Sequence, residues 1–388
     1  MARASFEEVG PKFLRITDIQ NEMVNWEKVP SCPIHEDDLK KHKLIDQDIV
    51  VARTGATTGK SYLVCDPPKS VAASYLIRLR VNDPNISAKF ISKYFQTYEY
   101  WNNIASGISG SAQGGFNASK LAELAVDIPP IDEQKRIVAI VDQAVEAIDG
   151  AIENTKQNLV NARELFESYL NDVFTQKGRD WDNLALETLT ERITKGSSPK
   201  WQGVNYVDKP GVLFVTSENV GQNQMLFEKI KYVEEIFNEI DSKSILICGD
   251  VLTNIVGASI GRTAIYDREE LANINQAVCL IRCKPDKLLN HYLAYLLNSP
   301  YFLQILHDNE IDNARANLSL GFFRGLQIPL PPLDEQQSIV SKMDNFFTET
   351  QRLEAIYRQK LTALTELKQS ILQKAFTGEL TADSAKAR

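Results

Sequence analysis

The chain has 388 residues, 43% hydrophobic and 24% charged, which is enough for two or more domains with cores of their own. It has no apolar run of about eighteen residues and no apolar signal core. We therefore expect no membrane span and, with five cysteines at unpaired spacing, a cytoplasmic location. A net charge of −8 excludes a protein that is basic overall, so any surface that binds nucleic acid must be a local patch.

The first distinctive motif is the glycine-rich stretch RTGATTGKS at residues 53–61, which follows an apolar run. It resembles the phosphate-binding loop of ATPases, but three residues separate Gly55 from Gly59 where that loop has four. A phosphate loop must also open a helix, whereas this one is followed by β-prone residues and then by Pro67 and Pro68. The pattern favours a turn between two strands over an ATP site.

The same motif occurs a second time in the chain. DIVVARTGATTGKSYLV at 48–64 returns as DVLTNIVGASIGRTAIY at 250–266, an offset of 202 residues. IPPIDEQ at 128–134 returns with the same offset as LPPLDEQ at 330–336. A constant offset between separate anchors predicts a tandem duplication of one globular block followed by one helix.

A long helical pattern follows the Pro-Pro pair in each copy, beginning at Asp132 and at Asp334, where aspartate can cap a helix. Apolar residues then recur every three or four positions, which is typical of a coiled coil. Two such helices related by a pseudo-twofold axis would pair antiparallel. The predicted seam residues are Val138, Val141, Val145, Ile148, Ile152, Thr155, Leu159, Ala162, Phe166, Tyr169 and Val173 in the first helix, and Met343, Phe347, Leu353, Tyr357, Leu361, Leu364 and Ile371 in the second.

The second copy begins with a segment, 181–212, whose counterpart would fall before residue 1. We therefore expect the first globular block to lack its opening strand. An unpaired strand edge is prone to pair with another chain, so this edge should be exposed or covered from elsewhere.

Together these motifs resemble the specificity subunit of a type I restriction–modification enzyme. The most specific are LPPLDEQQSIV at 330–340, ILQKAFTGEL at 371–380 and GDVLTNIVGASIGR at 249–262, and ITKGSSPKWQG at 193–203 resembles the opening of a target recognition domain. The resemblance implies an α+β fold in which two pseudo-twofold-related mixed α/β target recognition domains are joined by two long helices that form an antiparallel coiled coil. The expected parts are recognition domain 1 at 1–131, a first spacer helix at 132–178, recognition domain 2 at 179–333, a second spacer helix at 334–380 and a tail at 381–388.

The resemblance also implies a non-catalytic subunit that binds double-stranded DNA. Each recognition domain would read one half of a bipartite target in the major groove, where base edges are distinguishable. The helices would set the spacer and dock two methyltransferase subunits, and restriction (translocase) subunits would join that core. No cofactor or metal is expected on this chain, since S-adenosylmethionine would be bound by the methyltransferase subunits. With its opening missing, the domain at 1–131 should discriminate its half-site less strongly.

Candidate DNA-contacting residues lie in the two glycine-rich turns and in polar loops of the second copy. Glycine permits close approach of the backbone, and hydroxyls and cations suit phosphate contacts. The same residues also suit a plain β-turn with solvated side chains, and both interpretations remain open. The candidates are Arg53, Thr54, Thr57, Thr58 and Lys60 in the first turn, Asn254, Ser259 and Arg262 in the second, and Lys195, Ser197, Ser198, Lys200, Trp201, Arg315 and Asn317 elsewhere.

Other functions agree with parts of the sequence. CDPPK at 65–69 resembles the Asp-Pro-Pro-aromatic motif of adenine methyltransferases, but Lys69 stands where an aromatic ring must stack on the flipped base. Cys279 and Cys283 have no histidine or cysteine partners nearby, which favours a structural role over zinc binding. The main alternative is a coiled-coil scaffold without DNA binding, which salt-dependent retention of DNA by the methyltransferase complex would distinguish.

Overall fold

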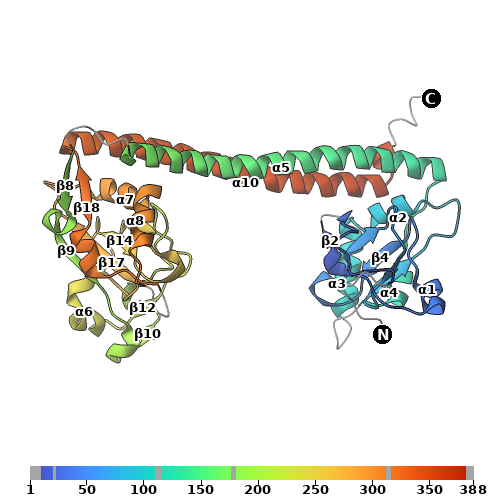
Figure 1. Cartoon of the computed structure of the whole chain (residues 1–388), viewed down its shortest axis with the longest axis horizontal. Helices are drawn as coiled ribbons and strands as arrows, with labels where there is room; N and C mark the ends of the chain where they lie inside the picture. Colours follow the sequence, from blue (N-terminus) through green and yellow to red (C-terminus); the bar gives the residue numbers. More distant parts are fainter. Residues whose placement is uncertain (1–9, 21–22, 110–115, 176–180, 312–315, 382–388) are drawn as a thin grey trace. The chain divides into compact units, whose positions relative to one another are not determined.

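The computed structural model describes residues 10–20, 23–109, 116–175, 181–311 and 316–381. The chain divides into two compact units: unit 1 comprises 1–156 with 359–388, and unit 2 comprises 157–358. Each unit contains a mixed α/β domain and parts of the two long helices, α5 (Ile131–Thr175) and α10 (Leu333–Phe376) (Figure 1).

Unit 1 is built, in the residues described, around an antiparallel sheet of β5 (Ser61–Leu63), β4 (Ile49–Ala52) and β7 (Leu76–Leu79), in that order. Two smaller strand pairs flank it: β1 (Lys12–Leu14) with β6 (Ser70–Ala72), and β2 (Ile19–Gln20) with β3 (Met23–Val24). The short helices are α1 (Glu36–His42), α2 (Ala88–Tyr94), α3 (Tyr98–Ser109) and α4 (Ala118–Ala122).

Unit 2 repeats this plan with more strands. Its described part has an antiparallel sheet of β15 (Thr263–Ile265), β14 (Val251–Asn254), β17 (Val278–Cys283) and β9 (Thr190–Lys195). A second sheet has the order β10 (Tyr206–Val207), β12 (Tyr232–Val233), β11 (Val212–Val215), β16 (Ala272–Ile274) and β13 (Ile245–Leu246). β18 (Gln327–Leu330) pairs with β8 (Asp182–Ala185). The short helices are α6 (Ile236–Ile240), α7 (Asn290–Asn298), α8 (Pro300–Asp308) and α9 (Leu320–Gly325).

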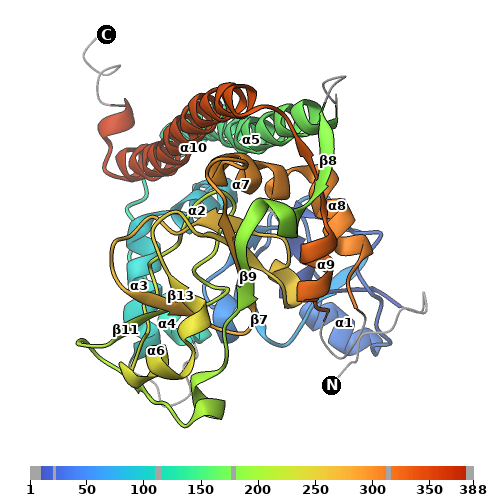
Figure 2. The same cartoon turned by 90° about the vertical axis from the view of Figure 1, so that its left-hand side faces the viewer.

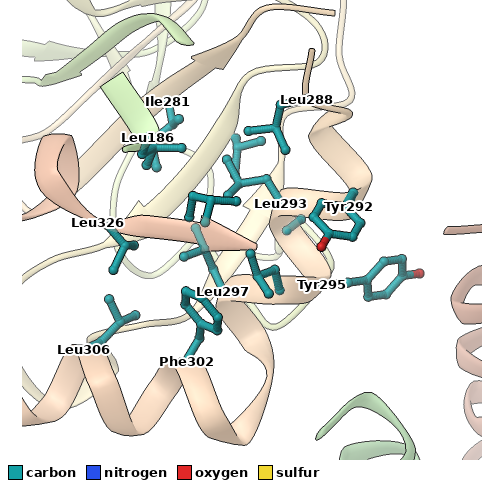
Figure 3. Packing of buried hydrophobic residues seen from close by; sticks show 14 of the residues in the cluster. Leu186, Ile281, Leu288, Tyr292, Leu293, Tyr295, Leu297, Phe302, Leu306 and Leu326 are labelled. Carbon is teal, nitrogen blue, oxygen red and sulfur yellow. The ribbon is translucent and has the colours of Figure 1, made fainter. Parts of the chain in front are cut away.

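In the main apolar cluster of unit 2, the sheet that contains β17 packs against the helices α7 and α8. Helix α7 lies between the sheet and the long helices (Figures 1 and 2), and its residues are almost all buried. Figure 3 shows Leu293 and Leu297 of this helix among Leu186, Ile281 and Phe302, all of which belong to one apolar cluster. Burying such side chains is the main favourable term in folding.

Equivalent contacts 202 residues apart confirm the duplication. In unit 1 the Arg80 guanidinium bonds both carboxylate oxygens of buried Asp48 at 2.7 Å, and in unit 2 Arg282 bonds buried Asp250 in the same way at 2.8 Å. The hydrogen bond to the carboxylate raises the pKa of each arginine above its ordinary value. Each pair fixes the start of one central strand, β4 or β14, against the end of its neighbour.

A buried glutamine ties each domain to the first turn of its long helix. Gln134 Oε1 accepts from Ser87 N at 2.8 Å, and its Nε2 donates to the carbonyls of Asn85 at 2.8 Å and Pro129 at 2.7 Å. Gln336 makes the three equivalent bonds, with Leu289 N, Lys287 O and Pro331 O, at 2.9, 3.0 and 2.9 Å. The motif Pro-Pro-x-Asp-Glu-Gln is thus a junction between domain and helix.

The two long helices run antiparallel within each unit. In unit 2, Phe166 lies 5.5 Å from Phe347 between ring centroids, and Arg163, one turn earlier, bonds Glu354 of α10 through two contacts of 3.0 Å. Residue numbers therefore rise along one helix as they fall along the other. In unit 1, Lys368 bonds Asp149 at 2.8 Å, which fits the same direction.

The predicted seam is confirmed along α5, where most of its members are buried: Val138, Val141, Val145, Ile148, Thr155, Ala162 and Phe166. On α10 the prediction for Leu353 was wrong, because this side chain is 37% exposed and Glu354 takes the buried position at 7%. A carboxylate can occupy that position because Arg163 and Arg358 bond it, at 3.0 and 2.7 Å. The bond from Arg163 holds the pKa of the Glu354 carboxyl below its usual range.

No helix in the described part of the chain is at once long enough and apolar enough to cross a membrane.

Gln336→Ala should lower the free energy of unfolding by roughly 2–4 kcal/mol, because it leaves a buried N–H group and two carbonyls without partners. Gln337→Ala is a matched control, since Gln337 is the next residue and is exposed. Chemical denaturation followed by circular dichroism measures both variants. Equal stability of the two would show that the junction does not depend on these bonds.

Candidate nucleic-acid interface

The glycine-rich motifs form turns between antiparallel strands, as the sequence predicted. The first connects β4 to β5 through a short 3-10 turn, η2 (Gly55–Thr57), and the second connects β14 to β15 through η6 (Gly257–Ser259). All four glycines have positive φ, between 77° and 88°. This left-handed conformation costs glycine least, so the backbone alone explains much of the motif.

The second glycine of each turn also packs beneath a helix. A Cβ atom on Gly59 would lie 2.9 Å from the Ile104 side chain of α3, and one on Gly261 would lie 2.5 Å from the Leu303 side chain of α8. Tyr100 Oη also donates to Gly59 O at 2.7 Å. These contacts fix the base of each turn on its own domain and leave the side chains at the tip for other contacts.

In unit 1 the candidate residues separate into exposed and bonded side chains. Arg53, Thr54 and Thr57 are exposed. Thr58 is buried and its hydroxyl donates to Gly55 O at 2.7 Å, while the Lys60 ammonium donates to the Ile19 carbonyl at 2.8 Å. The last two side chains therefore have structural partners within the domain.

The turn of unit 2 shows the same separation. Arg262 is exposed and Ser259 is half-buried, but Asn254 is fully buried, and its Nδ2 donates to Ser217 O at 3.0 Å and to Ser259 Oγ at 3.2 Å. Asn317 is half-buried and forms a β-bridge with Val256 beside the turn. Arg315 lies outside the described residues.

The remaining candidates follow β9. Lys195, Lys200 and Trp201 are exposed, and Trp201, on the 3-10 turn η4 (Pro199–Gln202), has 79% of its surface accessible. Ser198 is half-buried, and Ser197 Oγ donates to the Asp241 carboxylate at 2.6 Å. The loop thus presents two exposed lysines, Lys195 and Lys200, beside the exposed indole of Trp201.

Sheet topology brings the two groups of unit 2 together. β14 and β9 each pair antiparallel with β17, so they run in the same direction and Asn254 and Lys195 lie at the same end of the sheet. Sequence reasoning missed a further cation at this end, Arg324 of α9. Arg324 lies close enough to Cys279 for its charge to act on that thiol, as does the charge of Lys195. Burial raises the pKa of the Cys279 thiol to about 12, and these two positive charges oppose that shift. Arg324 is exposed, and its repeat counterpart is Ala122, so the duplication gave no signal for it.

Arg262 also lines a cleft of about 450 Å³ inside unit 2, between the turn and the long helices. Arg163, Glu354 and Arg358 line its helical side. Across the described residues, no group of three or more histidine, cysteine, aspartate or glutamate side chains is arranged to hold a metal ion. The exposed cations, hydroxyls and indole suit the binding of an anionic polymer better than they suit covalent chemistry.

Comparison with known proteins adds an independent line of evidence. A family model described as the type I restriction modification DNA specificity domain matches residues 7–162 and 178–363. The specificity subunit of the type I restriction enzyme EcoBI from Escherichia coli is 24% identical over 360 residues, which cover 87% of this chain and 74% of that protein. The MjaVIII specificity subunit from Methanocaldococcus jannaschii is 21% identical over 350 residues, covering 86% and 79%.

Solved structures share the fold. A chain from a structure described as "Structural basis underlying complex assembly and conformational transition of the type I R-M system" matches with a TM-score of 0.77 at 21% identity, covering 95% of this chain and 92% of that one. The HsdS subunit from Thermoanaerobacter tengcongensis matches with a TM-score of 0.59 at 20% identity, covering 98% and 94%. These likenesses confirm the predicted class of two mixed α/β domains with long helices.

Proposed function

Because this chain belongs to the family of type I restriction–modification DNA specificity subunits, we propose that it recognises a bipartite DNA target. One recognition domain reads each half in the major groove. The observation that carries this proposal is the duplication: both copies lie within the family match, and both present a turn at one end of the central sheet. A duplicated reading domain suits a target with two separate halves.

The exposed side chains at these sheet ends are the proposed contacts. Cations and hydroxyls suit the DNA backbone, and an exposed indole suits stacking or apolar contact with bases. In unit 1 they are Arg53, Thr54 and Thr57, and in unit 2 they are Lys195, Lys200, Trp201, Arg262 and the added Arg324. We assign Thr58, Lys60 and Asn254 a supporting role, since the Thr58 hydroxyl, the Lys60 ammonium and the Asn254 amide nitrogen each donate to groups of the protein itself.

The long helices serve the assembly in this proposal. We propose recognition domains at 1–131 and 179–333 and spacer helices at 132–178 and 334–380, with the helices docking two methyltransferase subunits. Those subunits bind S-adenosylmethionine and carry the chemistry, and restriction subunits join them in the cytoplasm. A net charge of −8 is compatible with this role because partner subunits can neutralise DNA phosphates.

Mapping of methylated bases in genomic DNA tests the proposal. Cells that carry the methyltransferase subunit with this chain should contain one bipartite methylated motif, which should vanish when this chain alone is removed. The isolated chain should transfer no methyl groups. If the motif persists without the chain, the proposal fails, and a complex that binds no DNA at low salt would identify a scaffold protein instead.

Lys200→Gln should weaken DNA binding by the methyltransferase complex and lower the slope of log affinity against log salt by about one, the expected loss for one phosphate contact. Lys287→Gln is the matched control, because Lys287 is exposed and follows the opposite end of β17. Fluorescence anisotropy over a salt series gives both slopes. Identical slopes for the two variants would remove Lys200 from the interface.

Lengthening both helices tests their role in setting the spacer. Four added residues extend a helix by about 6 Å, close to two base-pair steps of about 3.4 Å. Duplicating Ile152–Thr155 in α5 and Thr362–Thr365 in α10 places each insertion between Asp149–Lys368 and Arg163–Glu354, so both ion pairs keep their partners. The methylated motif should keep both half-sites and gain one or two spacer base pairs.

Insertion in α10 alone is the control for this experiment. It lengthens one helix without the other and should weaken assembly, because the two ion pairs no longer fit one register. An unchanged spacer in the doubly extended protein, with methylation intact, would contradict the spacer role.

A further inference from the structure

Each unit contains a cleft at the same place, beside its long helix. In unit 1 the cleft has a volume of about 510 Å³ and lies among β3, β5, α2 and α5. In unit 2 it has a volume of about 320 Å³ and lies among residues 223–225, β15, α7 and α10. Most positions that line the second cleft correspond to lining positions of the first, 202 residues earlier. Three such pairs are Met23 with Met225, Leu63 with Ile265, and Asp142 with Asp344.

Both clefts offer the same apolar contact. Met23 is 68% exposed, and Met225, Leu63 and Ile265 are half-buried. The chain has only four methionines, so finding two of them at equivalent positions of the two copies is a specific correspondence. Methionine is an adaptable side chain that is common on binding surfaces, and its sulfur packs favourably against aromatic rings.

Both clefts also offer a carboxylate from the long helix. Asp142 Oδ1 bonds the Lys93 ammonium at 2.7 Å, and Asp344 Oδ1 accepts from the Tyr295 hydroxyl at 2.7 Å. The two aspartate side chains are 51% and 48% exposed. Because a carboxylate can accept several hydrogen bonds, each has room for a further donor from outside the domain.

The remaining charges differ between the clefts. The first is lined by Asp66, Lys89 and Lys93, whereas the second is lined by Asp267 and His291. An occupant that fits both clefts therefore has to be uncharged, with an apolar body and a hydrogen-bond donor. Tyrosine and tryptophan have this combination, and such side chains are frequent anchors of protein interfaces.

The duplication identifies the source of this occupant. Two equivalent clefts call for the same side chain twice, which a partner present in two copies supplies. None of the residues outside the described ranges is a tyrosine or tryptophan, so those segments of the chain do not supply it.

We propose that each cleft receives a tyrosine or tryptophan side chain from one of two identical partner subunits. The ring packs on Met23 or Met225, and its O–H or N–H group donates to Asp142 or Asp344. This inference rests on the proposed function, in which the two identical partners are the methyltransferase subunits.

Replacing Met23 or Met225 by the photo-crosslinker p-benzoylphenylalanine tests the proposal in the complex with the methyltransferase subunit. Both positions should crosslink to the same segment of that subunit, and mass spectrometry should find a tyrosine or tryptophan in it. The same replacement of Tyr98 or Ile236, which are 67% and 46% exposed, is the control and should not crosslink to that segment. Crosslinks to two different segments, to this chain, to DNA alone, or to nothing would overturn the proposal.

Met23→Glu places a charge in the first cleft without disturbing a buried side chain. It should weaken binding of one methyltransferase copy roughly tenfold or more, because the aromatic ring would bury that charge. Titration followed by native mass spectrometry should then show one copy per chain where the unchanged chain and Tyr98→Glu bind two. Met225→Glu should likewise lose one copy, and the double variant should lose both.

The outcomes separate this inference from the proposed function. A chain that binds no methyltransferase subunit contradicts both. A chain that binds two copies, and keeps both of them in each single variant, contradicts only the role of the clefts. Should Met225→Glu fail to fold, the crosslinks from position 225 decide the case for unit 2.

Discussion

A buried amide needs partners for all its polar atoms, and the junction between each domain and its long helix is organised around that requirement. Gln134 and Gln336 bind the carbonyl of the preceding proline and two backbone groups of the chain just ahead of α2 or α7. The first turn of the helix and the start of the domain's own helix are therefore fixed together. Equivalent aromatic contacts lie on the same short helices: Phe90 of α2 packs on Phe376, and Tyr292 of α7 packs on Phe174, with ring centroids 4.8 and 5.5 Å apart.

Much of this architecture is visible in the sequence because it depends on local patterns. The offset between repeats, the Pro-Pro stops and the heptad stripe predict the domains and helices, and the glycine spacing predicts the turns. Glu354 could not be predicted, because its burial depends on Arg163, which lies 191 residues away in the sequence. Among the candidate contacts, polar residues such as Thr58 and Asn254 look the same in sequence whether they bond the backbone or face solvent, and only the fold shows their partners. Comparison of the two repeats could not predict Arg324, because the equivalent residue of the first copy is Ala122 and the arginine occurs in the second copy alone.

The two copies share the contacts that hold each domain together but differ in the side chains of their glycine-rich turns. Besides the Asp–Arg pairs, Lys93 bonds Asp142 at 2.7 Å where Tyr295 bonds Asp344 at 2.7 Å, so even a substituted pair keeps its position between domain and helix. At the turns, Arg53 corresponds to Ile255 and Thr54 to Val256, whereas the glycines are unchanged. Under the proposed function, such divergence lets one scaffold serve two different half-sites, because specificity resides in a few side chains on a shared backbone.

The composition of unit 1 has a consequence for how the protein is made. Its apolar core includes Leu372 and Ala375, with Phe376 and Leu380 packed against it, although the rest of that core comes from residues before 146. Unit 2, by contrast, is one continuous stretch from 157 to 358. A ribosome delivers the chain from its N-terminus, and domains generally fold as their residues emerge. The domain synthesised first must therefore wait for the last helical turns before its core is complete, while the domain synthesised second already has all its parts. The two cores are therefore completed in the reverse of the order in which their first residues are synthesised.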